Sequence, residues 1–84
     1  MGRAHRIRPK RLAGKLLAIR TDLDLTQPEL IKRLAVKGVR LYPASISMYE
    51  QGRREPSLIV LLRYARLAGV TMDVLVDDKL DLPK

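Results

Sequence analysis

The chain of 84 residues has no cysteine, tryptophan or phenylalanine and only three tyrosines. The lack of cysteine excludes disulfides, thiolate-bound zinc and cysteine nucleophiles. With so few aromatic rings, a stacking platform for single-stranded nucleic acid is not expected. The longest apolar runs hold about five residues, far fewer than the roughly 20 that cross a bilayer, and no stretch resembles the apolar centre of a signal peptide. We therefore expect one small cytoplasmic domain with no membrane partner.

Side chains that carry chemistry are also scarce. The single histidine, His5, lies in a basic stretch with no carboxylate near it in the sequence, so it is a poor candidate for a ligand or a base. No cluster has the spacing of metal ligands, and no glycine-rich loop could cradle a phosphate. Asp77 and Asp78 lie in a tail where nothing is expected to hold them in place. The chain is therefore expected to be no enzyme and to need no cofactor or metal.

Charge is abundant but unevenly distributed. The net charge is +8, and residues 1–20 contain seven basic side chains and no acid. Residues 73–84 contain four aspartates against two lysines. This pattern favours a polyanionic partner for the basic end, although a solvated end would have the same composition. It divides the chain into a basic flexible arm (1–8), a folded domain (9–76) and an acidic, lightly ordered tail (77–84).

Two helices are predicted in the first half of the domain. Leu12, Leu16, Ile19 and Leu23 form one helical stripe, and the helix is expected to begin at Pro9 and to end at Asp24 in a left-handed turn. A second helix begins with the capping box at Thr26–Glu29, with Pro28 in its first turn. Its buried residues are predicted to be Leu30, Ile31 and Leu34, and Gly38 is its predicted end.

A third helix, without lysine or arginine, is predicted at residues 43–51, ending at Gly52. At 100° per residue, Ile46, Tyr49 and Glu50 lie on one face, which is expected to pack inward. The opposite face carries Ala44, Ser47, Met48 and Gln51. Small side chains without charge suit a helix that lies in a DNA major groove. A plain polar surface helix is the alternative interpretation.

Two more helices complete the prediction. Ser57 begins the fourth, which ends at Gly69, and Thr71 begins the fifth, which runs through Val76. The inner stripe of the fourth helix is predicted to be Leu58, Leu61, Leu62, Ala65 and Ala68. A second apolar set, Val60, Tyr64, Leu67, Val74, Val76 and Leu80, forms either a dimer face or part of the core. With no strand candidate, the fold class is all-α.

Several short motifs occur in a set order along these helices. They are Thr26-Gln27-x-Glu29-Leu30, Ile46-Ser47, Glu50-x-Gly52, Pro56-Ser57-Leu58 and Ala68-Gly69-Val70-Thr71-x-Asp73. Together they resemble the helix-turn-helix family of phage repressors, Cro proteins and bacterial relatives, often called the xenobiotic-response-element family. The resemblance runs from Leu12 to Val76. It implies a compact five-helix lambda-repressor-like bundle in a bacterial or phage protein of the nucleoid, double-stranded DNA as partner, and a homodimer on near-palindromic sites.

The resemblance also implies roles for individual residues. Carried over by position, the base-reading residues are Pro43, Ala44, Ser45, Ser47 and Met48, and helix geometry adds Gln51. Gln27 matches a glutamine that contacts DNA, and Arg20 and Glu50 match an internal ion pair. The basic residues that flank the recognition helix or lie in the arm are expected to contact the DNA backbone: Arg40, Arg53, Arg54, Arg3, Arg6, Arg8, Lys10 and Arg11. For Arg53 and Arg54, a solvated turn is the alternative.

Three features depart from the family pattern. The turn before the third helix is longer than the common form, Asp24 stands where a glycine is usual, and Pro43 and Ala44 cannot make bidentate contacts with bases. The expected function is a sequence-specific, DNA-binding transcription regulator, most simply a repressor. The alternative is an antitoxin-like or adaptor module of the same fold, which binds a protein partner through the tail or the apolar stripe and binds DNA weakly.

Overall fold

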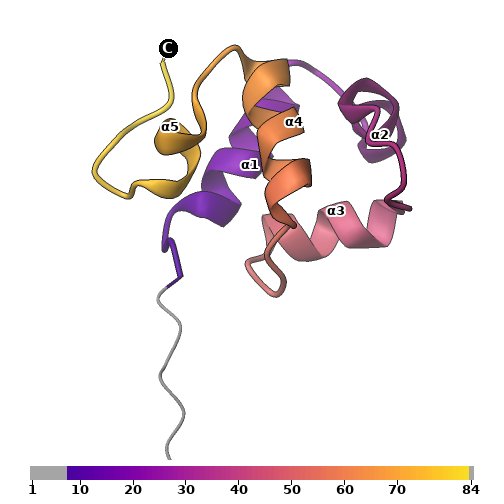
Figure 1. The fold of residues 1–84 in the computed structure, drawn as a ribbon, viewed down its shortest axis with the longest axis horizontal. Helices are drawn as coiled ribbons and strands as arrows, with labels where there is room; N and C mark the ends of the chain where they lie inside the picture. The colour runs from indigo at the N-terminus through magenta and orange to yellow at the C-terminus, as the bar shows by residue number, and fades with distance from the viewer. Residues whose placement is uncertain (1–7, 84) are drawn as a thin grey trace, which may run out of the picture.

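A computed structural model describes residues 8–83, and within this range the chain forms five α-helices and no strand. The helices are α1 (Leu12–Asp22), α2 (Gln27–Leu34), α3 (Pro43–Glu50), α4 (Leu58–Ala68) and α5 (Met72–Val76). Figure 1 shows α4 crossing the middle of the bundle, with α5 on one side, α2 on the other and α3 along the lower edge. The all-α prediction is therefore confirmed.

A single apolar core joins the helices. Each helix contributes at least one side chain with no exposed surface: Leu16, Leu30, Leu34, Ile46, Tyr64 and Leu75. Burying a large apolar side chain stabilises a fold by roughly 1.5–3 kcal/mol, so these positions fix how the helices pack. Leu12 and Ile19 are also buried, as predicted, but Leu23 lies beyond the end of α1 and is exposed.

The turns agree with the predictions at some positions and differ at others. Asp24 adopts the predicted left-handed conformation, with φ 56°, and the predicted Thr26–Glu29 capping box is formed. The predicted beginning of α1 at Pro9 is wrong, because the helix begins at Leu12. The predicted end of α2 at Gly38 is also wrong. The helix ends at Leu34, and Ala35 adopts the left-handed conformation that closes it, with φ 50°. Gly38 is also left-handed, with φ 79°, but lies in the turn that follows.

A contact from α4 accounts for the early end of α2. Arg63 Nε donates a hydrogen bond of 2.8 Å to the carbonyl oxygen of Leu34. The last carbonyls of a helix have no partner within the helix and need one from elsewhere. Arg63 supplies that partner from 29 residues away, so local sequence signals could not reveal it.

The buried face of α4 is wider than the predicted stripe and rotated from it. Leu58 was expected inside but is 77% exposed, whereas Val60 and Tyr64 are buried. The reason is the central position of α4, which packs against α1, α2 and α5. Val60 and Tyr64 therefore belong to the core rather than to a dimer face. Val76 and Leu80 of the same predicted set remain exposed.

The hydroxyl of Tyr64 is buried without a hydrogen-bond partner among residues 8–83. Burial raises the pKa of this group well above its usual value, and an unpaired buried hydroxyl costs about 1–3 kcal/mol. We expect Tyr64→Phe to leave the free energy of unfolding unchanged or to raise it by up to about 2 kcal/mol. Tyr64→Ala should lower it by about 3–5 kcal/mol, because it opens a cavity. Urea denaturation measures both, and a clear loss in Tyr64→Phe would contradict the expectation.

The tail is not loosely attached. The Asp78 carboxylate accepts hydrogen bonds from the backbone N–H groups of Lys10 (2.9 Å) and Arg11 (3.0 Å), just before the first turn of α1. Arg11 pairs with Asp81 and donates to the carbonyl oxygen of Asp78. These backbone bonds lower the pKa of Asp78. The prediction that nothing holds Asp78 in place is therefore wrong.

Lys15 makes a second connection between α1 and the end of the chain. Its side chain is buried, and its Nζ donates to the carbonyl oxygens of Val74 (2.7 Å) and Asp77 (2.9 Å) at the end of α5. A cation is favoured at a helix C-terminus. Lys15 is therefore a structural residue, although the sequence showed it only as part of the basic end.

Candidate nucleic-acid interface

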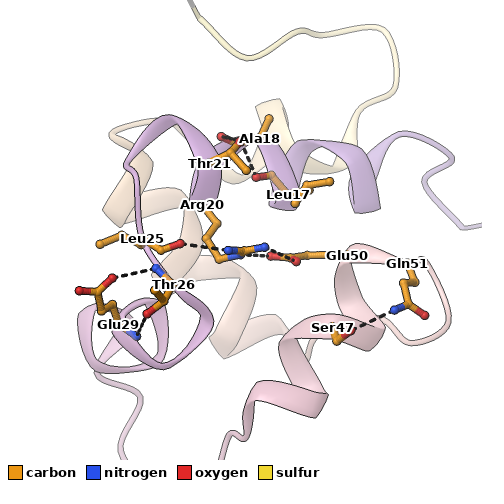
Figure 2. A network of polar contacts seen from close by, with 10 residues as sticks. All are labelled: Leu17, Ala18, Arg20, Thr21, Leu25, Thr26, Glu29, Ser47, Glu50 and Gln51. Atoms are coloured by element: carbon orange, nitrogen blue, oxygen red, sulfur yellow. Dashed lines mark hydrogen bonds and ion pairs between the residues drawn. The ribbon is translucent and has the colours of Figure 1, made fainter.

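An ion pair fixes the orientation of α3. Figure 2 shows Arg20 of α1 between Glu50 of α3 and the turn that follows α1. Arg20 Nε lies 2.6 Å from Glu50 Oε2, Nη2 lies 3.0 Å from Oε1, and Nη1 donates to the carbonyl oxygen of Leu25 at 3.0 Å. The bond to Glu50 raises the pKa of Arg20. The predicted pair is thus confirmed, and it ties α1, α3 and the start of the α2 segment together.

The first turn of α3 is held by its own backbone. Tyr42 is extended, with φ −122° and ψ 159°, and its carbonyl oxygen accepts from the N–H groups of Ser45 (2.8 Å) and Ile46 (3.2 Å). The Tyr42 N–H donates to Ser45 Oγ at 3.3 Å. Pro43 follows at the first helical position, where its missing N–H costs nothing. Ser45, a predicted base reader, is therefore half-buried and engaged in a cap.

The two faces of α3 divide as predicted. Ile46 and Tyr49 are buried, whereas Pro43, Ala44 and Met48 are exposed. On the outer face, half-buried Ser47 and exposed Gln51 form a pair in which Gln51 Nε2 donates to Ser47 Oγ at 3.0 Å (Figure 2). The Gln51 amide oxygen and the Ser47 hydroxyl hydrogen are not used by this bond. With the second N–H of the Gln51 amide, the outer face can therefore present one acceptor group and two donors to a base edge.

The short helices α2 and α3 thus pack as a pair against α1 and α4. The outer face of α3 carries no charge. A family model described as helix-turn-helix matches residues 16–75, well over half of the chain. The chain belongs to this family. Within it, the Cro and C1 repressors are the type that the chain resembles, so the protein is a DNA-binding transcription regulator with a lambda-repressor-like fold. No curated protein and no solved structure matches the chain significantly.

In this helix-turn-helix protein, exposed arginines flank α3 at both ends. Arg40 precedes the helix, and Arg53 and Arg54 follow it in the turn to α4. None of the three forms a salt bridge among the described residues. Gln27 lies half-buried at the first position of α2. The contacts of these four residues with the DNA backbone stay predictions.

The arm residues assigned to DNA are placed differently. Arg3 and Arg6, with His5, lie outside the described residues. Arg8 Nε is 3.8 Å from Glu55, close to the turn after α3, and the Lys10 side chain is exposed. Arg11 is directed to the tail, where it pairs with Asp81. The structure therefore places Arg8 near the turn after α3 and gives Arg11 a partner in the tail, and contacts of these residues with DNA stay predictions.

Sequence reasoning missed one exposed side chain at this surface. Tyr42, directly before α3, is 53% exposed, whereas Tyr49 and Tyr64 belong to the core. Its signal in the sequence was its place at the start of the recognition helix, next to the short side chains Pro43 and Ala44. In the part of the chain that the structure describes, no acidic or histidine cluster could hold a metal ion. No helix there has the length and apolar character to span a membrane.

Proposed function

We propose that this regulator is sequence-specific, reads the major groove with α3 and acts as a repressor, most effectively as a homodimer. The observation that carries the proposal is the uncharged outer face of α3 between exposed Arg40 at one end and Arg53 and Arg54 at the other. A helix of this kind can lie against base edges while the flanking cations bind phosphates.

Affinity and selectivity would come from different residues. Phosphate neutralisation by arginines supplies most of the binding and no direct sequence information. Selection would come from Ser47 and Gln51, which can hydrogen-bond base edges, and from Ala44 and Met48, which can contact thymine methyl groups. Because the start of α3 lacks a long amide or guanidinium, we expect selectivity to be modest at the bases nearest Pro43.

The repressor and dimer assignments rest on simpler arguments. A domain of this size can repress by occupying promoter DNA, with no further activity. Val76 and Leu80 are exposed apolar side chains on α5 and the tail, away from α3. Apolar surface of this kind supports association of two copies, and a dimer would favour a near-palindromic site.

The test is a salt titration of binding to two DNA pools, random duplex and duplex enriched by repeated selection. We expect the selected duplex to bind at least about a hundredfold more tightly. If about six phosphates are neutralised, log affinity should fall against log salt with a slope near −5. Symmetry in the selected site would support the dimer. Equal, salt-steep binding to both pools would contradict a sequence-specific regulator.

Equal binding would favour the second candidate, an antitoxin-like or adaptor module. The observation that supports it is the thin base-reading face, where Pro43 and Ala44 offer no hydrogen-bonding side chain. Leu58 and Ile59 add an exposed apolar pair at the start of α4. In that case a protein partner would be the primary ligand and DNA a secondary one.

A further inference from the structure

Burial alternates along the segment that leads into α3. Val39 and Leu41 are partly buried and pack against the core, whereas Arg40 is exposed and Tyr42 is 53% exposed. In extended chain, successive side chains point to opposite sides. The alternation therefore places Arg40 and Tyr42 together on the solvent side, at the point where α3 begins.

Tyr42 is presented from a fixed position. Its carbonyl oxygen and its N–H are both engaged by the first turn of α3, chiefly through Ser45, and Pro43 restricts the backbone after it. Leu41 anchors the chain on the other side. Within residues 8–83 the Tyr42 hydroxyl donates no hydrogen bond, since the side-chain cap at this helix start is the Tyr42 N–H donating to Ser45 Oγ. A rigid backbone thus carries a long side chain with an unused donor.

The position of Tyr42 suits a contact at the edge of a DNA major groove. Sugar-phosphate strands border the major groove on both sides, so a long side chain just before a recognition helix can reach a phosphate. Tyrosine hydroxyls are among the groups that donate to phosphate oxygens. The positive end of the helix dipole and the Arg40 guanidinium both favour a phosphate at this point.

We propose that Tyr42 is a DNA-contacting residue whose hydroxyl donates a hydrogen bond to a phosphate oxygen beside the phosphate bound by Arg40. The proposal rests on the function proposed above, because it requires α3 to lie in the groove. Next to the short side chains of Pro43 and Ala44, Tyr42 supplies a side chain long enough to reach the DNA backbone. The contact positions α3 in the groove and does not read a base.

Two variants separate this contact from an ionic one. Tyr42→Phe removes only the hydroxyl, and Arg40→Gln removes one charge. We expect Tyr42→Phe to weaken binding about three- to tenfold on both the selected and the random duplex. Its salt slope should match that of the unmodified protein, since a neutral hydroxyl displaces no counterion. Arg40→Gln should weaken binding and make the slope shallower by about one.

Thermal unfolding of Tyr42→Phe should match that of the unmodified protein, because the ring is retained. Unchanged affinity of Tyr42→Phe on both pools would overturn the proposal. A loss confined to the selected duplex would also overturn it, because the hydroxyl would then contact a base. If the unmodified protein binds both pools equally and Tyr42→Phe weakens both, the phosphate contact stands and sequence specificity fails. If it binds neither pool, both proposals fail.

Discussion

Ser47→Glu is expected to weaken binding to the selected duplex by more than about a hundredfold. Ser47 lies on the outer face of α3, and a carboxylate there would approach the phosphates and the acceptor-rich base edges. Like charges brought together at an interface cost several kcal/mol, enough for a loss of this size. The variant also removes the hydroxyl that Gln51 contacts at 3.0 Å. Fluorescence anisotropy with labelled duplex at fixed salt measures the effect.

Thr21→Glu is the matched control, because it changes the net charge by the same amount. Thr21 is exposed at the end of α1, and within residues 8–83 its hydroxyl bonds only to carbonyl oxygens of its own helix, those of Leu17 and Ala18. Figure 2 places it well apart from Ser47. Its effect on affinity should stay below about threefold, as expected for a distant, screened charge. Equal losses in the two variants would show a general charge effect and contradict the assignment of α3.

Glu50→Ala is expected to lower the free energy of unfolding by about 2–4 kcal/mol. The Glu50 side chain is 7% exposed and that of Arg20 is 19% exposed, so the variant leaves a guanidinium partly enclosed without its carboxylate. Removing one partner of a buried pair typically costs about 3–5 kcal/mol, and partial exposure reduces this. For a domain of this size, the melting temperature should fall by about 10–25 °C, which a thermal denaturation curve measures.

A double variant, Arg20→Met with Glu50→Leu, tests the cause of that loss. It removes both charges and fills the space with apolar atoms, so it should regain more than half of the lost free energy. A loss below about 1 kcal/mol in Glu50→Ala would mean that the pair contributes no more than a surface salt bridge. A double variant as unstable as Glu50→Ala would point to lost packing instead of an unpaired charge.

Local patterns predicted α3 and the beginning of α2 well. The faces of α3 followed from helical periodicity, since Ile46 and Tyr49 can share a buried side only if Ala44 and Met48 face out. The capping box at Thr26 and Glu29 involves residues three apart in the sequence, so the sequence alone contains it. The Arg20–Glu50 pair came from the resemblance to a family, since its partners are 30 residues apart.

Features set by distant residues were mispredicted. The end of α2 depends on Arg63, and the beginning of α1 depends on Asp78, which is 67 residues from Arg11. Charge counting assigned Arg11 to DNA, which stays a prediction, and it could not reveal that Arg11 also has a partner within the fold. The face of α4 was misjudged for a related reason. A helix surrounded by three others buries more than one stripe, so Val60 and Tyr64 entered the core.

The hydrogen bonds from Lys10 and Arg11 to Asp78 make the two ends of the described chain neighbours, although the family match stops at residue 75. The folded domain is therefore longer than residues 16–75, the part that the family model matches. A fragment that ends at residue 75 would lose the Asp78 carboxylate that accepts from Lys10 and Arg11, and the Asp77 carbonyl oxygen that accepts from Lys15. Expression fragments and C-terminal fusions of this domain should keep the chain at least through Leu82, which packs against the core.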